Sequence, residues 1–274
     1  MRTIQLLACA TLAVFHGAIH AQQPATSPGA EPGARLQAAV NGAHRSDADK
    51  ARDQYRHPVE TLAFFGIRED MTVVELWPGG GWYTRILAPL LKDRGKLYLA
   101  AYKPGLIIRN ATNTQREEVA AKPEVFGKPI FTVLEKGEYD IAPPGSADLV
   151  LTFRNLHNWM DDGHVEAVFQ AIHRALKPGG VLGLVEHRAP PGPQDPRAKS
   201  GYVTEAHTIK LAEAAGLRLV ARSEINANPK DTKDHPKGVW TLPPSYALKD
   251  VDREKYAAIG ESDRMTLKFV KPAN

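Results

Sequence analysis

The sequence predicts an α/β fold, in which a mainly parallel sheet of seven strands is covered by helices on both faces. Short apolar runs typical of buried strands alternate along the chain with stretches whose apolar residues recur at helical spacing. Strands separated by helices need crossover connections, and such connections join parallel strands. The chain has 274 residues, of which 43% are hydrophobic, and this size fits one domain with a large core.

The first 21 residues have the features of a secretory signal peptide. Arg2 gives the positive start, Ile4–Phe15 form an apolar run, and small residues end at Ala21. The run is shorter than the roughly 20 residues of a spanning helix, so we expect no stable membrane insertion. The only cysteine, Cys9, lies in this segment, and a faint likeness of residues 6–9 to a lipoprotein signal leaves lipidation as an alternative. We expect a periplasmic or secreted protein.

The next segment, residues 22–45, is rich in Pro, Gly, Ala and Gln, which predicts a flexible linker without a fold of its own. The folded domain is then expected over residues 46–274. It begins with two short helices, one running from Ser46 or Asp47 towards Tyr55 and one over Val59–Phe65.

Strands and helices then alternate. Pro178–Gly180 predict a turn before the fifth strand, and the turn-rich stretch Asn226–Lys249 is expected to be a functional or mobile loop. The strands are expected over Met71–Leu76, Lys96–Ala101, Ile130–Leu134, Asp148–Phe153, Val181–Glu186, Leu217–Ser223 and Met265–Val270. Helices are expected over Tyr83–Leu91, Arg109–Ala121, His164–Leu176 and Thr204–Ala215.

Three glycines, Gly79, Gly80 and Gly81, lie between the first of these strands and the helix that follows it. Glycines let a backbone turn tightly and approach a ligand closely, and the N–H groups of a helix start favour a carboxylate or phosphate. The segment is not a P-loop, because no Gly-Lys-Ser/Thr follows. It is not the dinucleotide fingerprint either, because Thr84 stands at the third glycine position. A tight turn without a ligand is the alternative.

Three segments resemble the motifs of class I S-adenosylmethionine-dependent methyltransferases, in that superfamily's order and spacing. Val73–Gly81 resembles the first motif, and Asp148–Leu151 followed by Asn155–His157 resembles the fourth-strand segment. Leu176–Leu182 resembles the turn before the fifth strand. The resemblance implies a Rossmann-like fold whose last strand is antiparallel, S-adenosylmethionine as cofactor, and transfer of a methyl group.

In finer detail the chain resembles a secreted bacterial group of predicted methyltransferases, through Pro78–Thr84 and Arg154–Trp159. The superfamily resemblance implies roles on the cofactor side. Glu75 would order the glycine loop and meet the ligand's amino group, and the N–H groups of the three glycines would face its carboxylate. The ring of Tyr83 or Trp82 would lie against the cationic sulfonium, or would simply pack.

The chain departs from the superfamily at two positions. Trp77 stands where most members have the first glycine of the loop, and the second strand ends at Tyr102 without the carboxylate that usually binds the ribose. Tyr102 can contribute one hydrogen bond in its place. Glu135, after the third strand, is expected near the adenine.

Candidate catalytic residues follow the fourth and fifth strands. Methyl transfer to oxygen or nitrogen needs the acceptor held in line and a proton removed. His157 is a base near neutral pH, Glu186 can orient a histidine or take the proton, and Asn155 and His187 are further candidates. The alternatives are a turn cap at Asn155 and a structural ion pair over Glu186–Arg188. Because no HxxxH or HxH spacing involves His157, His187 or His235, we expect no metal at these residues.

The leading hypothesis is a secreted methyltransferase that acts on a small molecule. A non-catalytic or repurposed ligand-binding protein on the same fold is the alternative. A hydrolase is weaker, since the chain has no Gly-x-Ser-x-Gly elbow. The net charge of +4 is spread along the chain without a basic run, so we expect no nucleic-acid partner. Two polar clusters, Arg52–His57 and the late loop, either close the site or are solvated surface. The sequence does not determine the oligomeric state.

Overall fold

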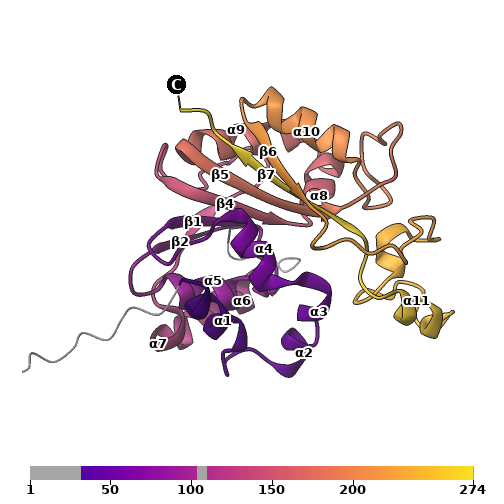
Figure 1. Cartoon of the computed structure of the whole chain (residues 1–274), viewed down its shortest axis with the longest axis horizontal. Coiled ribbons are helices and arrows are strands. Elements are labelled where there is room, and N and C mark those ends of the chain that lie inside the picture. The colour runs from indigo at the N-terminus through magenta and orange to yellow at the C-terminus, as the bar shows by residue number, and fades with distance from the viewer. Residues whose placement is uncertain (1–31, 104–109, 274) are drawn as a thin grey trace, which may run out of the picture. The chain divides into compact units, whose positions relative to one another are not determined.

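A computed structural model describes residues 32–103 and 110–273, and they contain a seven-stranded sheet (Figure 1). The strands are β1 (Thr72–Leu76), β2 (Lys96–Ala101), β3 (Ile130–Val133), β4 (Ala147–Phe153), β5 (Leu176–His187), β6 (Arg218–Ser223) and β7 (Arg264–Val270). Their order across the sheet is β3-β2-β1-β4-β5-β7-β6. β7 is antiparallel to both of its neighbours, and the other pairings are parallel. The predicted fold class and all seven predicted strands are therefore confirmed.

The strand order reverses direction between β1 and β4, which lie side by side in the sheet. Ligands of open α/β sheets bind at such a switch point, outside the carboxyl ends of the strands. The glycine segment follows β1, and the predicted catalytic residues follow β4 and end β5. The topology therefore brings the predicted cofactor side and acceptor side to one edge of the sheet.

Helices cover both faces of this sheet, and Figure 1 shows α9 and α10 on one side and α1, α4 and α5 on the other. The first core surrounds Trp159 and Phe169, and the second surrounds Phe65 and Phe126. No helix in the described part of the chain is long and apolar enough to span a bilayer. The helices are α1 (Pro32–Asn41), α2 (Asp47–Lys50), α3 (Asp53–Arg56), α4 (Pro58–Phe65), α5 (Thr84–Leu91), α6 (Asn110–Ala121), α7 (Pro123–Phe126), α8 (Leu156–Asp161), α9 (Val165–Ala175), α10 (Glu205–Ala214), the 3-10 helix η2 (Gly238–Thr241) and α11 (Arg253–Ile259).

The prediction of an unfolded linker over 22–45 was wrong for its second half, where helix α1 forms. Leu36, Ala39 and Val40 are buried in the second core, at the i, i+3, i+4 spacing of an amphipathic helix. Arg45 then donates to the Val40 carbonyl at 2.6 Å and forms a bidentate pair with Asp53. The surrounding Pro and Gly hid this short periodic signal. Residues 22–31 and the predicted signal at 1–21 lie outside the described residues.

Some shorter features also differ from the prediction. Helices α7, α8 and α11 were not predicted, and the predicted turn at Pro178–Gly180 is the irregular beginning of β5, beside a register shift in its pairing with β4. Helix α6, predicted from a polar stretch over Arg109–Ala121, buries Gln115 and Val119. The late loop is packed, since Asn226 and Asp231 are buried within it.

Candidate active site

The glycine segment after β1 forms a tight turn at the switch point of the sheet. Trp77, Gly79 and Gly81 have positive φ values of 42°, 57° and 79°. Only glycine adopts this backbone region without strain. A Cβ atom added to Gly79 or Gly80 would meet nothing within 4 Å, so both residues face open space. They line a cavity of about 290 Å³ that extends to the ends of β1 and β4.

Glu75 lies beside this turn and is buried. Its Oε2 accepts a hydrogen bond from Thr84 Oγ1 at 2.5 Å, and the Gln115 amide donates to the same hydroxyl oxygen. Burial raises the pKa of Glu75 to about 8, and the hydrogen bond from Thr84 opposes the rise. No cationic side chain of residues 32–103 or 110–273 forms an ion pair with Glu75. Since Glu75 also lines the cavity, a ligand ammonium placed there would supply the missing charge.

Two aromatic rings follow the turn. The Tyr83 ring stacks on Phe153, with centroids 3.4 Å apart and an angle of 8° between the planes, and burial raises its pKa to about 12. Arg56 and Arg45 cover the Trp82 ring, with guanidinium carbons 4.6 and 4.9 Å from its centroid. Both rings therefore pack against the protein's own side chains, and of the two Trp82 has the cation–π partners.

The Trp77 indole lies at the ends of β2 and β3, between Tyr102 and Leu134. Its Nε1 donates to the Leu134 carbonyl oxygen at 2.7 Å, and its ring centroid lies 4.5 Å from that of Tyr102. Glu135 follows directly, with its carboxylate 3.4 Å from the Lys103 backbone nitrogen. The structure thus gathers the predicted nucleoside residues, Tyr102 and Glu135, at one edge and adds an indole to them.

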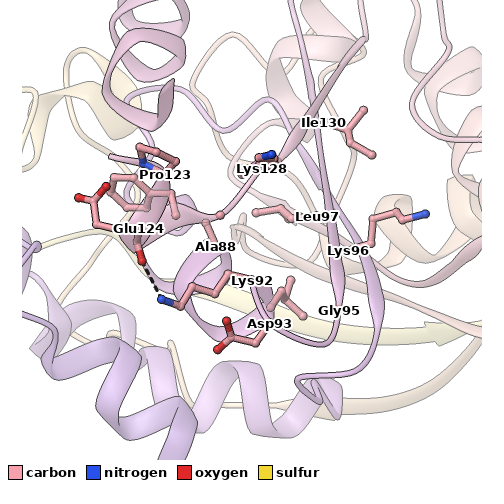
Figure 2. A pocket seen from close by; sticks show the side chains of 14 residues that line it. Ala88, Lys92, Asp93, Gly95, Lys96, Leu97, Pro123, Glu124, Lys128 and Ile130 are labelled. Carbon is pink, nitrogen blue, oxygen red and sulfur yellow. Dashed lines mark hydrogen bonds between the residues drawn. The ribbon is translucent and has the colours of Figure 1, made fainter. Parts of the chain in front are cut away.

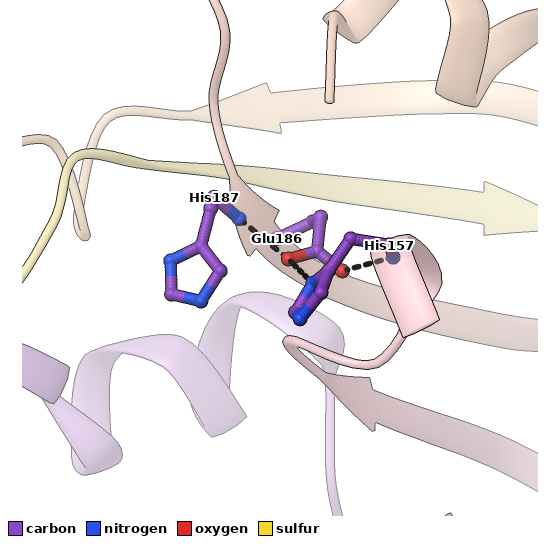
Figure 3. A group of neighbouring side chains, drawn as sticks. All are labelled: His157, Glu186 and His187. Atoms are coloured by element: carbon purple, nitrogen blue, oxygen red, sulfur yellow. Dashed lines mark hydrogen bonds and ion pairs between the residues drawn. The ribbon is translucent and has the colours of Figure 1, made fainter. Parts of the chain in front are cut away.

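The predicted catalytic residues come together at the ends of β4 and β5, where Figure 3 shows the Glu186 carboxylate between two histidines. Glu186 Oε1 lies 3.0 Å from His157 Nδ1 and accepts from the His187 backbone nitrogen at 2.8 Å. Oε2 accepts from the His157 backbone nitrogen at 3.3 Å. The Trp240 ring, from the late loop, lies 5.9 Å from the His157 ring between centroids. The late loop, for which the sequence left closure of the site and solvated surface as alternatives, thus reaches this site through Trp240.

His187 and Asn155 have structural partners. His187 Nδ1 lies 2.5 Å from Ser262 Oγ. Burial first, and then the charges of His157 and nearby arginines, hold the pKa of His187 well below its usual value, so the ring is neutral. Asn155 Nδ2 donates to the Leu76 carbonyl at 2.9 Å, which ties the end of β4 to the turn after β1. The side-chain amide of Asn155 therefore holds the backbone at the end of β1 in place.

His157, Glu186 and His187 also lie close enough to be considered as metal ligands, since one ligand atom from each falls within 4.8 Å of the others. Two observations oppose a cation here. The Glu186 carboxylate already accepts three hydrogen bonds, and the positive field of the arginines that lowers the pKa of His187 also repels a metal ion. Absence of a metal stays a prediction.

A cluster that sequence reasoning missed surrounds Glu261. This buried carboxylate contacts Arg52, Arg56, Arg154 and Arg264. Arg52 and Arg56 were noted in the sequence, but their carboxylate partner lies more than 200 positions away. Arg52, Arg56 and Arg154 line the same cavity as the glycine turn.

A larger cavity, of about 540 Å³, lies between α5, α7 and the beginning of β2 (Figure 2). Its lining includes Lys96 and Leu97, which begin the strand, so it lies away from the carboxyl ends of the strands. The Lys92 ammonium donates to the Glu124 carbonyl at 2.7 Å. The ionisable side chains that line it are all exposed. The smaller cavity is therefore the better candidate for chemistry.

Comparisons with known proteins bear on the domain and the fold. Residues 75–184 match the family model described as a methyltransferase domain, whereas no curated protein sequence matches the chain. Among solved structures, an S-adenosylmethionine-dependent methyltransferase from Aquifex aeolicus matches with a TM-score of 0.54 and 16% identity, over 87% of this chain and 98% of that one. A putative sarcosine dimethylglycine methyltransferase from Galdieria sulphuraria has a TM-score of 0.53 and 17% identity, over 82% and 85%.

The cyclase SpnF has the same fold, with a TM-score of 0.54 and 16% identity, over 88% of this chain and 93% of its own. Identities this low show the fold alone. The fold together with the matched domain supports a methyltransferase that uses S-adenosylmethionine as its cofactor.

Proposed function

We propose that this chain is an S-adenosylmethionine-dependent methyltransferase that acts on a small-molecule acceptor outside the cytosol. The observation that carries the proposal is the Glu75 carboxylate, buried beside an open glycine turn without a cationic partner in the described part of the chain. An α-ammonium group would pair with Glu75, while the backbone at Gly79 and Gly80 leaves room for the neighbouring α-carboxylate. When bound, the cofactor supplies a methyl group on a cationic sulfur.

The nucleoside end of the site differs from the amino-acid end. Instead of a carboxylate after β2, the aromatic pair Trp77 and Tyr102 lies at this edge. Nucleobases stack on aromatic rings, with a typical contribution of about 1–3 kcal/mol per base. We therefore propose that Trp77 and Tyr102 bind the adenosine by stacking.

His157 and Glu186 are arranged to remove a proton from the acceptor. A carboxylate only accepts, so the short contact makes His157 Nδ1 the donor and leaves Nε2 with a lone pair. The two backbone hydrogen bonds to Glu186 fix the carboxylate that orients the ring. His157 is the proposed base and Glu186 its positioning residue; His187, held by Ser262, lies beside them.

Calorimetric titration of the purified chain with S-adenosylhomocysteine tests the proposal. We expect binding, and we expect Glu75→Gln to weaken it by on the order of tenfold, because the variant loses a charge-assisted hydrogen bond to the ammonium. Glu60→Gln is the matched control, since Glu60 is exposed on α4. Absence of heat and of a thermal shift at millimolar ligand would contradict the proposal.

The proposed location outside the cytosol depends on residues 1–21. Fractionation of cells that express the full chain, followed by N-terminal sequencing of the mature protein, tests it. We expect the mature chain to begin at Gln22. A mature chain that still begins at Met1 would overturn export.

A second candidate function is ligand binding without methyl transfer. The specific observation in its favour is the Trp77 indole, which stands across the ends of β2 and β3 and is hydrogen-bonded to Leu134. A chain of this fold need not transfer methyl groups, and fold alone does not fix function. Failure of S-adenosylhomocysteine to bind would favour this candidate.

A further inference from the structure

We infer that the small molecule bound beside the cofactor carries an anionic group, a carboxylate or a phosphate, held by Arg52, Arg56 and Arg154. This inference rests on the proposed function, because it assigns a chemical class to the acceptor of the same site.

The three arginines belong to one cluster around the buried Glu261 carboxylate. Arg52 Nε lies 2.6 Å from a Glu261 oxygen, Arg56 Nε 3.3 Å and Arg154 Nη1 3.8 Å, and Arg264 also pairs with this carboxylate. Four guanidinium groups thus share one carboxylate. Their charges hold the pKa of Glu261 well below its usual range, although burial acts in the opposite direction.

The ion pairs of Arg85, which also lines the cavity, do not balance this charge. Arg85 pairs with Glu118 at 2.6 Å and with Asp49 at 3.5 Å. In and beside the cavity, five guanidinium groups thus meet three carboxylates, and in the ligand-free chain the raised pKa of Glu75, about 8, keeps that carboxyl mainly protonated at neutral pH. Burial and the neighbouring Arg264 lower the pKa of Arg154 to about 10, as expected for cations that lack counter-charges.

The cluster has an unused hydrogen-bond donor beside the cavity. The Arg52 Nη2 atom is buried and has no hydrogen-bond partner. Arg154 has a φ of 63°, in the left-handed region that a residue with a side chain rarely enters. This strained residue directly follows β4, and its side chain lines the cavity. A planar guanidinium binds carboxylate and phosphate with two parallel hydrogen bonds.

The cofactor itself does not supply the missing negative charge. S-adenosylmethionine carries an ammonium, a sulfonium and one carboxylate, and its net positive charge is offset by the Glu75 carboxylate that pairs with the ammonium, so its binding leaves the excess positive charge of the arginines in place. The glycine turn offers separate space for that carboxylate. The excess positive charge of the arginines is therefore left for the second ligand to compensate. Arg56 and Arg154 also help to lower the pKa of His187, whose ring centroid lies 5.3 Å from that of the proposed base, His157, so the anion site lies close to the acceptor end of the site.

The test is calorimetric titration of the purified chain with inorganic phosphate and with benzoate, at constant ionic strength. Benzyl alcohol is the uncharged match for benzoate. We expect both anions to bind, benzyl alcohol to bind at least tenfold more weakly, and saturating S-adenosylhomocysteine to leave anion binding intact. Comparison of the affinities for phosphate and for benzoate shows whether the site prefers a phosphate or a carboxylate.

Variants locate the site. Arg52→Gln and Arg154→Gln should each lower the anion affinity by on the order of tenfold, because each removes a charge-assisted contact, while S-adenosylhomocysteine affinity stays within about twofold. The Arg52 side chain is 27% exposed, so its variant is the safer one for folding. Arg68→Gln is the control, since Arg68 is an exposed arginine paired with Asp70 before β1.

The outcomes separate this inference from the proposed function. Binding of S-adenosylhomocysteine without any anion binding would overturn the inference alone. Displacement of the anions by S-adenosylhomocysteine would also overturn the inference, and so would weaker binding of S-adenosylhomocysteine to Arg52→Gln. In either case the arginines would hold the cofactor's carboxylate. Anion binding without S-adenosylhomocysteine binding would support the arginine site and overturn the methyltransferase proposal.

Discussion

The Trp77 indole donates a hydrogen bond to the Leu134 carbonyl oxygen, at 2.7 Å, and so links the turn after β1 to the end of β3. The indole stands at a position whose φ of 42° favours glycine. The strain is tolerated because the ring also packs against Tyr102 and Trp159. In the proposed function, this ring forms one stacking surface for the adenosine.

Replacement of Trp77 by Ala tests that role. If adenosine stacks on Trp77, the variant should bind S-adenosylhomocysteine about ten- to a hundredfold more weakly, because one stacking surface is lost. Its affinity for methionine alone should not change. Calorimetry with both ligands measures the two effects. Tighter S-adenosylhomocysteine binding by the variant would show instead that the indole blocks the nucleoside site, which would favour the ligand-binding function.

Gly80 offers a test of the turn without a cost to folding. Its φ lies outside the positive region, and an added Cβ would meet nothing within 4 Å. Gly80→Leu should therefore leave the thermal midpoint nearly unchanged but should abolish S-adenosylhomocysteine binding, since the side chain would enter the cavity. Gly80→Ala should have a smaller effect in the same direction. Unchanged affinity in Gly80→Leu would mean that the turn touches no ligand.

His157→Ala should slow turnover by about 10² to 10⁴-fold, the range for loss of a general base. Binding of S-adenosylhomocysteine should be unaffected. The measurement needs an acceptor, found by screening anionic small molecules for release of S-adenosylhomocysteine. Asn158→Ala is the control, because Asn158 lies in the same turn of α8 and its side chain forms no hydrogen bond within the described residues. Equal turnover of His157→Ala and the control would remove His157 as the base.

Glu75 should make the stability of the ligand-free chain depend on pH. Its folded pKa, about 8, lies above the ordinary value of 4.5, so the folded state keeps a proton that the unfolded state loses. This contribution is complete below pH 4.5 and is lost as the pH rises through 8, by up to a few kcal/mol. Relative to Glu75→Gln, the wild type should therefore lose stability between pH 5 and 8.5 in urea unfolding. If the free energies of unfolding of the two proteins changed in the same way with pH, the raised pKa of Glu75 would be contradicted.

Helix α1 should contribute to folding stability. Leu36 is only 4% exposed, so Leu36→Ala should lower the free energy of unfolding by about 2–4 kcal/mol through loss of core packing. Gln37→Ala, on the exposed side of the same helix, should change it by less than about 0.5 kcal/mol. Urea unfolding measures both. Equal stabilities of the two variants would mean that α1 is not part of the cooperative fold.

Much of the fold was predictable from local sequence because each strand carries its own apolar run. Met71–Leu76 and Val181–Glu186 needed no partner to be recognised, and the glycines after the first strand marked the ligand edge. Helix α1 was missed because its apolar positions are few and lie between Pro and Gly. Short α8 was missed for a related reason, since one and a half turns give almost no periodic signal.

The composition of the candidate site could be predicted only in part. The sequence supplied Glu75, His157 and Glu186 as separate residues, because they follow or end strands that a parallel sheet aligns at one edge. It could not supply their geometry. Whether Tyr83 faced a ligand or stacked on Phe153 depended on packing across the sheet.

What the sequence by itself determined is therefore the order of strands and helices and the edge at which ligands bind. The tertiary structure alone decided which distant groups meet: Glu186 with His157 across 29 positions, and Arg52 with Glu261 across 209. The physical reason is that apolar periodicity is a local property of the chain, whereas charge pairing acts through space and leaves no regular spacing in the sequence. For this protein that difference separates the fold, which could be foreseen, from the charged cavity, which could not.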